Sequence, residues 1–313
     1  MLVHGRVTHE MFGVAESNGA VKVRRDLPMK GGNDSFYQQR PALTIDDGRV
    51  FADFGGLAGD CGPYVGTVIG VPLAGSGTLS TWRVPTSREG GIWAVGGPVV
   101  GPGGNLWISI GNSANGPGQP YDGGDSVTRL SLSKSGLLSR RDFFAPLTWG
   151  SDNDSDLDLG SSTPVLAAGN STFIMGKSGN GYLLETQHLG GVSAPRAEAP
   201  VCRAFGAGAL SGSVVFEPCT SGGMAAISVN AAKRSIRVLW RGPAAAGGSP
   251  SVGGGSVWVP GSGGVLYELN PANGAVRSQV SLGAALPRFC SVSLAGNKAF
   301  VGTLDGVVAV NGA

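Results

Sequence analysis

The sequence predicts an all-β protein, a β-propeller of four-stranded antiparallel blades. A unit of about 40 residues recurs along the chain, and each unit contains four short strand-like segments. The 313 residues include 55 Gly and 19 Pro, a composition that suits many tight turns between short strands. Apolar residues alternate with others in segments such as SVWVPG and GVLYELN, whereas helical periodicity is nearly absent. A pair of β-sandwiches is the rival fold, but sandwiches do not need a fixed period.

The repeat divides the chain into five full blades and two fragments. The full blades are predicted at residues 38–85, 90–146, 160–200, 204–242 and 247–283. Residues 289–313 stop after a third strand, and residues 1–27 supply a third and a fourth strand. We therefore expect a single propeller domain over residues 1–313. It has six blades if the two fragments close together, and seven if the first fragment completes itself.

Composition and charge exclude several classes of function. The formal net charge is +2, and no run of Lys and Arg is long enough to follow a phosphate backbone, so we expect no nucleic-acid partner. No segment reaches the roughly 18 apolar residues of a spanning helix, so we expect no transmembrane segment. The first residues, MLVHGRVTHE, lack the apolar core of a signal peptide.

Four cysteines are scattered along the chain, at Cys61, Cys202, Cys219 and Cys290. They form no CxxC pair, which argues against a structural zinc site. Cys202 and Cys219 flank the candidate hairpin AFGAGALSGSVVFEP. Either the two bridge the ends of this hairpin, or both are small buried hydrophobic residues. A bridge would place the protein outside the reducing cytosol.

A few aromatic and polar residues stand at the ends of predicted strands. Trp93 and Asn112 lie at the two ends of the segment GGIWAVGGPVVGPGGNLWISIGN, which consists of two strand-like runs and a glycine turn. Taken singly, each has an ordinary explanation, because Trp is common in cores and Asn commonly ends a strand. The acidic run SDNDSDLDLG is typical of a solvated loop, and Lys177 precedes a hairpin turn.

The blades resemble those of the pyrroloquinoline quinone (PQQ) quinoprotein propellers, which include the quinoprotein alcohol dehydrogenases. The copy GGVLYELNPANGAVRSQVSL is similar to the blade signature of that family. Similar blade endings occur in non-catalytic propellers, among them the outer-membrane assembly lipoprotein. Blade similarity therefore implies the fold rather than an activity.

The resemblance also implies a cofactor site, because four motifs occur in the order of the family. Trp93, in GGIW, matches the tryptophan that stacks on PQQ, and Asn112 matches the asparagine that binds calcium. Asp60, in GGLAGDCGPYVG, stands in place of a calcium-binding glutamate. Asp156, in the acidic run, matches the aspartate that acts as catalytic base, and Lys177, in GKSGNGYLLE, matches the cation beside the quinone.

The chain departs from the family pattern in four ways. Asp60 is one methylene shorter than the expected glutamate, and the acidic run lacks the tryptophan of the family motif. The adjacent pair of cysteines found over the quinone in many of these dehydrogenases is missing, and so are the N-terminal blades of the eight-bladed ring. The chain is either an N-terminally truncated member or a smaller ring built on the same repeat.

Three functions follow from these features. The first is a calcium- and PQQ-dependent dehydrogenase of a small alcohol or sugar, extracytoplasmic or secreted as the resemblance implies. In it calcium polarises the quinone, Asp156 removes the alcohol proton and Lys177 offsets the charge of the reduced quinone. The second is a non-catalytic scaffold that binds a protein or glycan partner on its loop face. The third is glycosidase-like acid catalysis, with candidate carboxylates only in the loop from Asp152 to Asp158.

Overall fold

The computed structural model describes residues 2–3, 6–29 and 33–312. The described residues form antiparallel sheets joined by turns, which confirms the predicted class of all-β propeller. The chain forms two compact units, which we describe separately. Unit 1 contains residues 1–160 and 190–193, and unit 2 contains residues 161–189 and 194–313. The single domain expected from the sequence stays a prediction.

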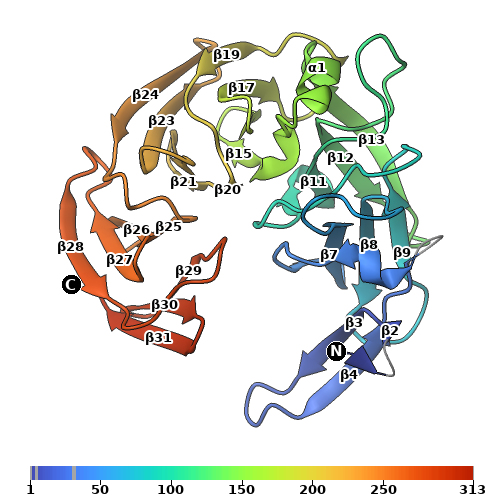
Figure 1. Ribbon diagram of the computed structural model, residues 1–313, viewed down its shortest axis with the longest axis horizontal. Helices are drawn as coiled ribbons and strands as arrows, with labels where there is room; N and C mark the ends of the chain where they lie inside the picture. Colours follow the sequence, from blue (N-terminus) through green and yellow to red (C-terminus); the bar gives the residue numbers. More distant parts are fainter. Residues whose placement is uncertain (1, 4–5, 30–32, 313) are drawn as a thin grey trace. The chain divides into compact units, whose positions relative to one another are not determined.

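Unit 1 contains two large sheets (Figure 1). In the first, β6, β7, β8 and β9 are neighbours in sequence order, and β5 pairs with the far end of β7. In the second, β10 to β13 follow in order, and β18 adds a parallel strand beyond β13. The bounds of the first sheet are β5 (Tyr37–Gln38), β6 (Thr44–Asp46), β7 (Arg49–Gly56), β8 (Thr67–Pro72) and β9 (Ser80–Arg83). Those of the second are β10 (Val99–Gly101), β11 (Asn105–Ile110), β12 (Ser126–Leu132), β13 (Leu138–Ala145) and β18 (Gly191–Val192).

Unit 1 also contains two hairpins and several short helical turns. The hairpins pair β1 (Leu2–Val3) with β2 (Arg6–Val7) and β3 (Glu10–Val14) with β4 (Val21–Asp26). The helical elements are η1 (Asp34–Phe36), η2 (Pro102–Gly104), α1 (Trp149–Asp154) and η3 (Leu159–Ser161), the last of which ends at the first residue of unit 2. Among the described residues, no helix has the length and apolar character needed to span a membrane.

Unit 2 contains three four-stranded sheets, one three-stranded sheet and a two-stranded parallel pair. The first sheet is β15 (Val165–Ala167), β16 (Ser171–Met175), β17 (Asn180–Glu185) and β19 (Ala197–Pro200). The second is β21 (Ala209–Ser211), β22 (Val214–Pro218), β23 (Met224–Asn230) and β24 (Ser235–Arg241). The third is β25 (Ser251–Gly253), β26 (Ser256–Gly261), β27 (Val265–Leu269) and β28 (Val276–Ser281). The three-stranded sheet is β29 (Val292–Ala295), β30 (Lys298–Thr303) and β31 (Gly306–Asn311), and the parallel pair is β14 (Ser162–Thr163) with β20 (Gly206–Ala207).

The middle strand β26 of unit 2 is buried on both faces because its sheet packs between two others. In β26, Val257 contributes to the apolar cluster shared with the preceding sheet, and its neighbour Trp258 contributes to the cluster shared with the following sheet. Successive side chains on a strand point to opposite faces, so both clusters draw on the same strand. All six residues of β26 are therefore buried, although the sequence SVWVPG alternates only in part.

A disulfide links Cys202, which follows β19, to Cys219, which follows β22. Of the two alternatives that the sequence left open, the bridge is the one that the structure contains. Cys61 and Cys290 are free thiols. The bridge joins the ends of two neighbouring sheets of unit 2 and closes a segment with a sequence separation of 17.

Replacing both bridged cysteines by serine should lower the free energy of unfolding by about 3 kcal/mol, because the unfolded chain regains the entropy of a closed loop of this size. Denaturant unfolding of Cys202→Ser/Cys219→Ser, followed by circular dichroism, measures the loss. Cys61→Ser is the matched control, because Cys61 is exposed and unbridged, and it should unfold like the parent protein. Equal stability of the double variant and the parent would contradict a structural role for the bridge.

Glu217, on β22, is a fully buried carboxyl group whose two oxygens have no hydrogen-bond partner. Three other sheets carry Ile108, Ile174 and Val259 at the matching position of their second strand. This position is one residue after the residue that pairs with the first residue of the first strand. Gly208 leaves the space for this carboxyl group, because a Cβ on Gly208 would lie 2.3 Å from Glu217 Oε1. Burial away from water disfavours the charged form and raises the pKa of Glu217 to about 8.

Glu217 should make the stability of the protein fall as pH rises from 4.5, the ordinary pKa of the group, to about 8. In this window the folded state holds one proton more than the unfolded state, so stability declines by up to about 1.4 kcal/mol for each pH unit. Below pH 4.5 Glu217 is protonated in both states, and the free energy of unfolding carries no penalty from this group. Above about pH 8 the whole loss of stability has occurred. Glu217→Gln keeps the site neutral, so its unfolding free energy should depend less on pH and exceed that of the parent at pH 9. Parallel curves for the two proteins in denaturant unfolding from pH 4 to 9 would contradict the raised pKa.

Candidate functional site

A segment without regular structure, residues 89–92, lies between the ends of the two large sheets of unit 1. The backbone N–H of Glu89 donates to Tyr64 O at 2.7 Å, and Gly90 donates to Asn112 O at 2.6 Å. Gly111 donates in turn to Gly91 O at 3.0 Å. The first run of the segment 90–112 is therefore a strand only from Val99 onward, because residues 89–92 bond to strand ends on both sides instead of pairing along one strand.

Glycine is required along this segment because the backbones approach too closely for side chains. A Cβ on Gly66 would lie 1.7 Å from Gly90 O, and Gly90 itself has a positive φ of 62°. A Cβ on Gly111 would lie 2.4 Å from Asp158 Oδ1 and 3.1 Å from Trp93 Nε1. The indole edge of Trp93 and the carboxyl group of Asp158 therefore meet over the bare backbone of Gly111.

Trp93 also contacts a cation that the sequence did not indicate. The guanidinium carbon of Arg40 lies 4.6 Å from the centroid of the Trp93 ring system, and Arg40 Nε donates to Trp93 O at 3.2 Å. A guanidinium over an aromatic face is attracted by the electrons of the ring. No motif marks Arg40, since it precedes β6 and is 53 residues from Trp93 in the sequence.

Asn112 lies between two carboxylates of the acidic run. Its backbone N–H donates to Asp158 Oδ1 at 2.8 Å, and its Nδ2 donates to Asp156 Oδ1 at 3.3 Å. Its amide oxygen, Oδ1, is buried and has no hydrogen-bond partner. Asp156, the predicted catalytic base, is exposed and has a positive φ of 53°, whereas Asp158 is only 4% exposed. Asp158, which matches no residue of the family motifs, is the buried carboxylate that lies with Trp93 over Gly111.

Asp60 belongs to an acidic cluster around a buried tyrosine. Tyr64 O–H donates to Asp60 Oδ1 at 2.5 Å. Burial raises the pKa of Tyr64, and so do this hydrogen bond and the negative charges of Asp60, Glu89 and Asp158. Burial also raises the pKa of Glu89; Arg88 opposes this shift, and the charges of Asp60 and Asp158 add to it. Tyr64 and Glu89 are further residues that sequence reasoning missed.

Other side chains of the acidic run hold the loops in place. Asn153 Oδ1 accepts from Ser113 N at 2.6 Å, and Asn153 Nδ2 donates to Ser113 O at 3.0 Å. Ser113 Oγ donates to Asp122 Oδ1 at 2.5 Å, while Thr148 Oγ1 donates to Asp152 Oδ2 at 2.6 Å. These bonds fix the loop after β11 against α1, and so they fix the position of Asn112.

Lys177 belongs to unit 2, in the turn between β16 and β17. Its Nζ lies 5.7 Å from the centroid of the Phe205 ring, and the guanidinium carbon of Arg288 lies 5.5 Å from the same centroid. Phe289 stacks on Phe205 with 4.8 Å between centroids. Within unit 1, Trp93 thus lies near the other predicted site residues of that unit, Asp60, Asn112 and Asp156. That Lys177 joins them in one site stays a prediction. Among the described residues, no three or more His, Cys, Asp or Glu side chains are grouped so as to hold a metal ion.

No protein-family model and no curated protein sequence matches the chain. Several solved structures do. BamB from Moraxella catarrhalis is 14% identical with a TM-score of 0.51, over 93% of this chain and 88% of that one. The quinohemoprotein alcohol dehydrogenase from Comamonas testosteroni is 11% identical with a TM-score of 0.64, over 96% of this chain and 61% of that one. The quinohemoprotein alcohol dehydrogenase ADHIIG from Pseudomonas putida is also 11% identical, with a TM-score of 0.63, over 92% and 58%.

These similarities show a shared β-propeller fold. At such low sequence identity, structural similarity shows the fold and does not show an activity. The chain spans less than two thirds of the length of the two dehydrogenases.

Gly111→Ala should destabilise the protein by about 1–3 kcal/mol, because the new methyl group displaces Asp158 and the indole of Trp93 from their packed positions. Thermal unfolding measures the loss, and near-ultraviolet circular dichroism reports the displaced tryptophan. Gly116→Ala is the matched control in the following loop, because a Cβ there meets nothing within 4 Å. If the two variants behave alike, the close approach over Gly111 does not position Trp93.

Proposed function

We propose that unit 1 carries a site for PQQ and a calcium ion, and that the protein is a PQQ-dependent dehydrogenase of a small alcohol or sugar. The observation that carries the proposal is the buried Asn112 Oδ1, an acceptor without a partner beside Trp93 and two carboxylates. A buried polar atom without a partner costs stability, so its persistence suggests a ligand that binds there. The similarity of the fold to quinohemoprotein alcohol dehydrogenases supports the same conclusion.

The oxygen atoms around Asn112 suit calcium. Calcium takes six to eight oxygen ligands from carboxylates and carbonyl groups, in flexible arrangements. Asn112 Oδ1 would supply one, and Asp60 and Asp158 would supply carboxylate oxygens from the cluster around Tyr64. A bound cation would also offset the charges of Asp60 and Asp158, which add to the effect of burial in raising the pKa of Glu89.

Trp93 and Arg40 suit a flat aromatic anion. PQQ is planar and carries three carboxylates, so an indole face and a guanidinium would recognise both of its properties. Arg40 lies against Trp93 within unit 1, and it would supply the cation that the family resemblance assigned to Lys177. When bound, PQQ supplies the two-electron oxidation chemistry, and the residues of this chain bind and orient it.

Asp156 is the residue that would take the proton from the substrate hydroxyl. Its carboxylate is exposed, so a substrate can reach it, and its Oδ1 is oriented by Asn112 Nδ2 at 3.3 Å. Its left-handed backbone is uncommon for a residue other than glycine, and such conformations concentrate at functional sites. Asp158, besides its proposed role as a calcium ligand, would position Asn112, because it is buried and its Oδ1 accepts from the backbone N–H of Asn112.

The second candidate is a scaffold that binds a protein or glycan partner through its loops. It is favoured by the structural use of the acidic run, in which Asp152, Asn153 and Asp158 hold loops in place. The match to BamB, which extends over most of both chains, suits this alternative as well. For both candidates we propose an extracytoplasmic location, because disulfides persist in oxidising compartments.

A titration of the chelator-treated protein with PQQ, with and without calcium, tests the first candidate. Isothermal calorimetry and the quinone absorbance should report about one PQQ for each chain, bound at least tenfold more tightly with calcium. Trp93→Phe should weaken PQQ binding while keeping the fold, and Asn112→Ala should abolish the calcium dependence. Asp154→Asn, an exposed position in the same acidic run, is the matched control and should bind like the parent.

The same titration separates the candidates. Absence of binding at high micromolar PQQ, in protein that unfolds cooperatively, would contradict the cofactor site and leave the scaffold. Binding that ignores calcium and is unaffected by Asn112→Ala would contradict the metal site alone. Turnover in a substrate screen with an artificial electron acceptor would then be needed to support the dehydrogenase.

A further inference from the structure

The hairpin of β3 and β4 in unit 1 has only two strands, whereas the complete sheets of the protein have four or more. Among the described residues, β3 pairs with β4 alone. Met11 and Leu27 pack with Phe54 and Ile69 in one apolar cluster, so the hairpin lies on the sheet of β6 to β9. In a complete sheet, the last two strands make the outer half of the contact with the neighbouring sheet. The hairpin of β3 and β4 makes only that half.

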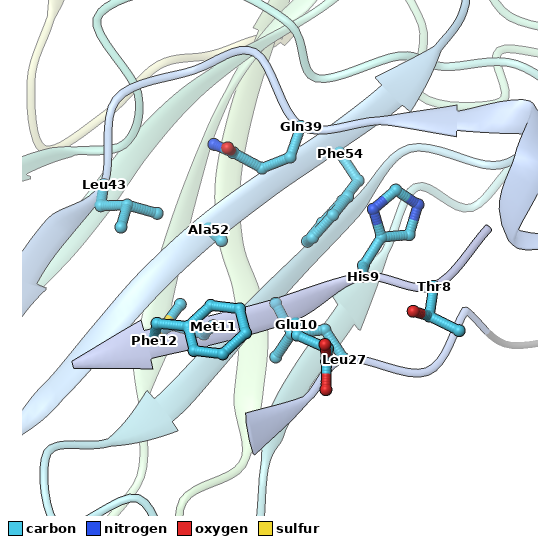
Figure 2. Close-up of a pocket in the computed structure, with 10 residues that line it drawn as sticks. All are labelled: Thr8, His9, Glu10, Met11, Phe12, Leu27, Gln39, Leu43, Ala52 and Phe54. Atoms are coloured by element: carbon cyan, nitrogen blue, oxygen red, sulfur yellow. The ribbon is translucent and has the colours of Figure 1, made fainter. Parts of the chain in front are cut away.

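The other half of this contact, which the first two strands of a complete sheet would make, is an open groove. A pocket of about 260 Å³ lies between β3 and the sheet that contains β7. Figure 2 shows the side chains that line it. Met11 and Phe12 line it from β3, Ala52 and Phe54 line it from β7, and Leu43 lines it from the residue before β6. The groove shares Met11, Leu27, Ala52 and Phe54 with the apolar cluster between the hairpin and the sheet, and the polar residues Thr8, His9 and Gln39 also line it.

The groove exposes large apolar side chains to water. Phe12 is 48% exposed and Leu43 is 51% exposed, and Ile45, on the neighbouring strand β6, is also exposed. The acidic residue at the rim is neutralised, because Arg24 donates to both carboxylate oxygens of Glu10 at 2.7 and 3.1 Å. An exposed apolar patch with a neutral rim is typical of a surface that binds an uncharged, apolar partner.

The complete sheets of unit 2 indicate the shape of that partner. There, the first strand of each sheet packs beside the first strand of the next, as β21 does beside β25 and β25 beside β29. These first strands are short and built of small and aliphatic residues, such as Ala209–Ser211 and Ser251–Gly253. A glycine-containing turn leads from each to a buried second strand such as β26. In unit 1, β6 packs in the same way beside β10.

We propose that this groove accepts a two-stranded β-segment of the same kind, which pairs with the free edge of β3 and completes the sheet. Backbone hydrogen bonds to β3 would give affinity, and apolar side chains of the segment would cover Phe12, Leu43 and Phe54. The segment is a short small-and-aliphatic strand, a glycine turn and a mostly apolar second strand. The inference does not rest on the cofactor site, although that site begins at Gly55 and Gly56, directly after the groove residue Phe54 on β7.

The test uses the full chain and a fluorescent peptide with the sequence of residues 248–261, GSPSVGGGSVWVPG, which covers β25 and β26. Fluorescence anisotropy should show saturable binding of one peptide to each chain. Leu43→Asp and Phe12→Asp should each weaken binding at least tenfold. Val21→Asp is the matched control, because Val21 is 57% exposed on β4 and does not line the groove. A peptide with proline in place of its two last valines should bind much more weakly, because proline removes donors from the strand.

Amide hydrogen exchange identifies where the peptide binds and guards against variants that fail to fold. The peptide should slow exchange in residues 10–14, the strand β3, in the unmodified protein. Absence of binding, protection elsewhere alone, or equal binding by Leu43→Asp, Phe12→Asp and Val21→Asp would overturn the proposal. Self-association of the protein that Leu43→Asp abolishes, with no peptide binding, would overturn it too, since the occupant would then be a second copy of the chain.

Discussion

The close approach of two glycine backbones, at Gly66 and Gly90, is the constraint on which the candidate site depends. The backbone of residues 89–92 fits between the two large sheets of unit 1 only because no side chain separates it from its neighbours. The backbone N–H groups of Glu89, Gly90 and Ile92 donate to carbonyl groups of the neighbouring segments, which satisfies them inside the protein. The direction in which Trp93 leaves the segment, and the contact between its indole edge and Asp158 over Gly111, follow from that threading.

Polar side chains around the candidate site of unit 1 mostly hold loops together, and the proposed function rests on the polar atoms that do not. Ser113, Asp122 and Asn153 satisfy one another and hold two loops together. Asn112 Oδ1 is one of several buried polar atoms of unit 1 without a partner, Asp53 Oδ1 and Ser80 Oγ among them, and it is the one whose residue bonds to Asp156 and Asp158. Burial without a partner is costly. Glu217 is the corresponding exception in unit 2, but its surroundings are apolar, so its main consequence is a dependence of stability on pH.

The repeat made the fold predictable, whereas the site was predictable only in part. Blade periodicity and glycine turns follow from local sequence, and so the four-stranded sheets could be expected. The motif residues Trp93, Asn112 and Asp156 do lie in one region of unit 1. Arg40, Tyr64 and Glu89 could not be recognised from the sequence, because their partners are distant along the chain or lie at spacings that match no motif. Asp158 is in the predicted acidic run, yet only its burial distinguishes it from Asp156.

By itself, the sequence determined the class of fold, the position of most turns and the candidate residues, since these depend on periodicity and backbone preference over short distances. Only the tertiary structure decided which carboxylate is buried beside Trp93, that Cys202 and Cys219 are bridged, and that Asn112 Oδ1 has no partner. Each of these depends on how closely segments far apart in the sequence approach one another. That distance is governed by side-chain volume at the contacts, as at Gly66, Gly111 and Gly208, and no local pattern records it.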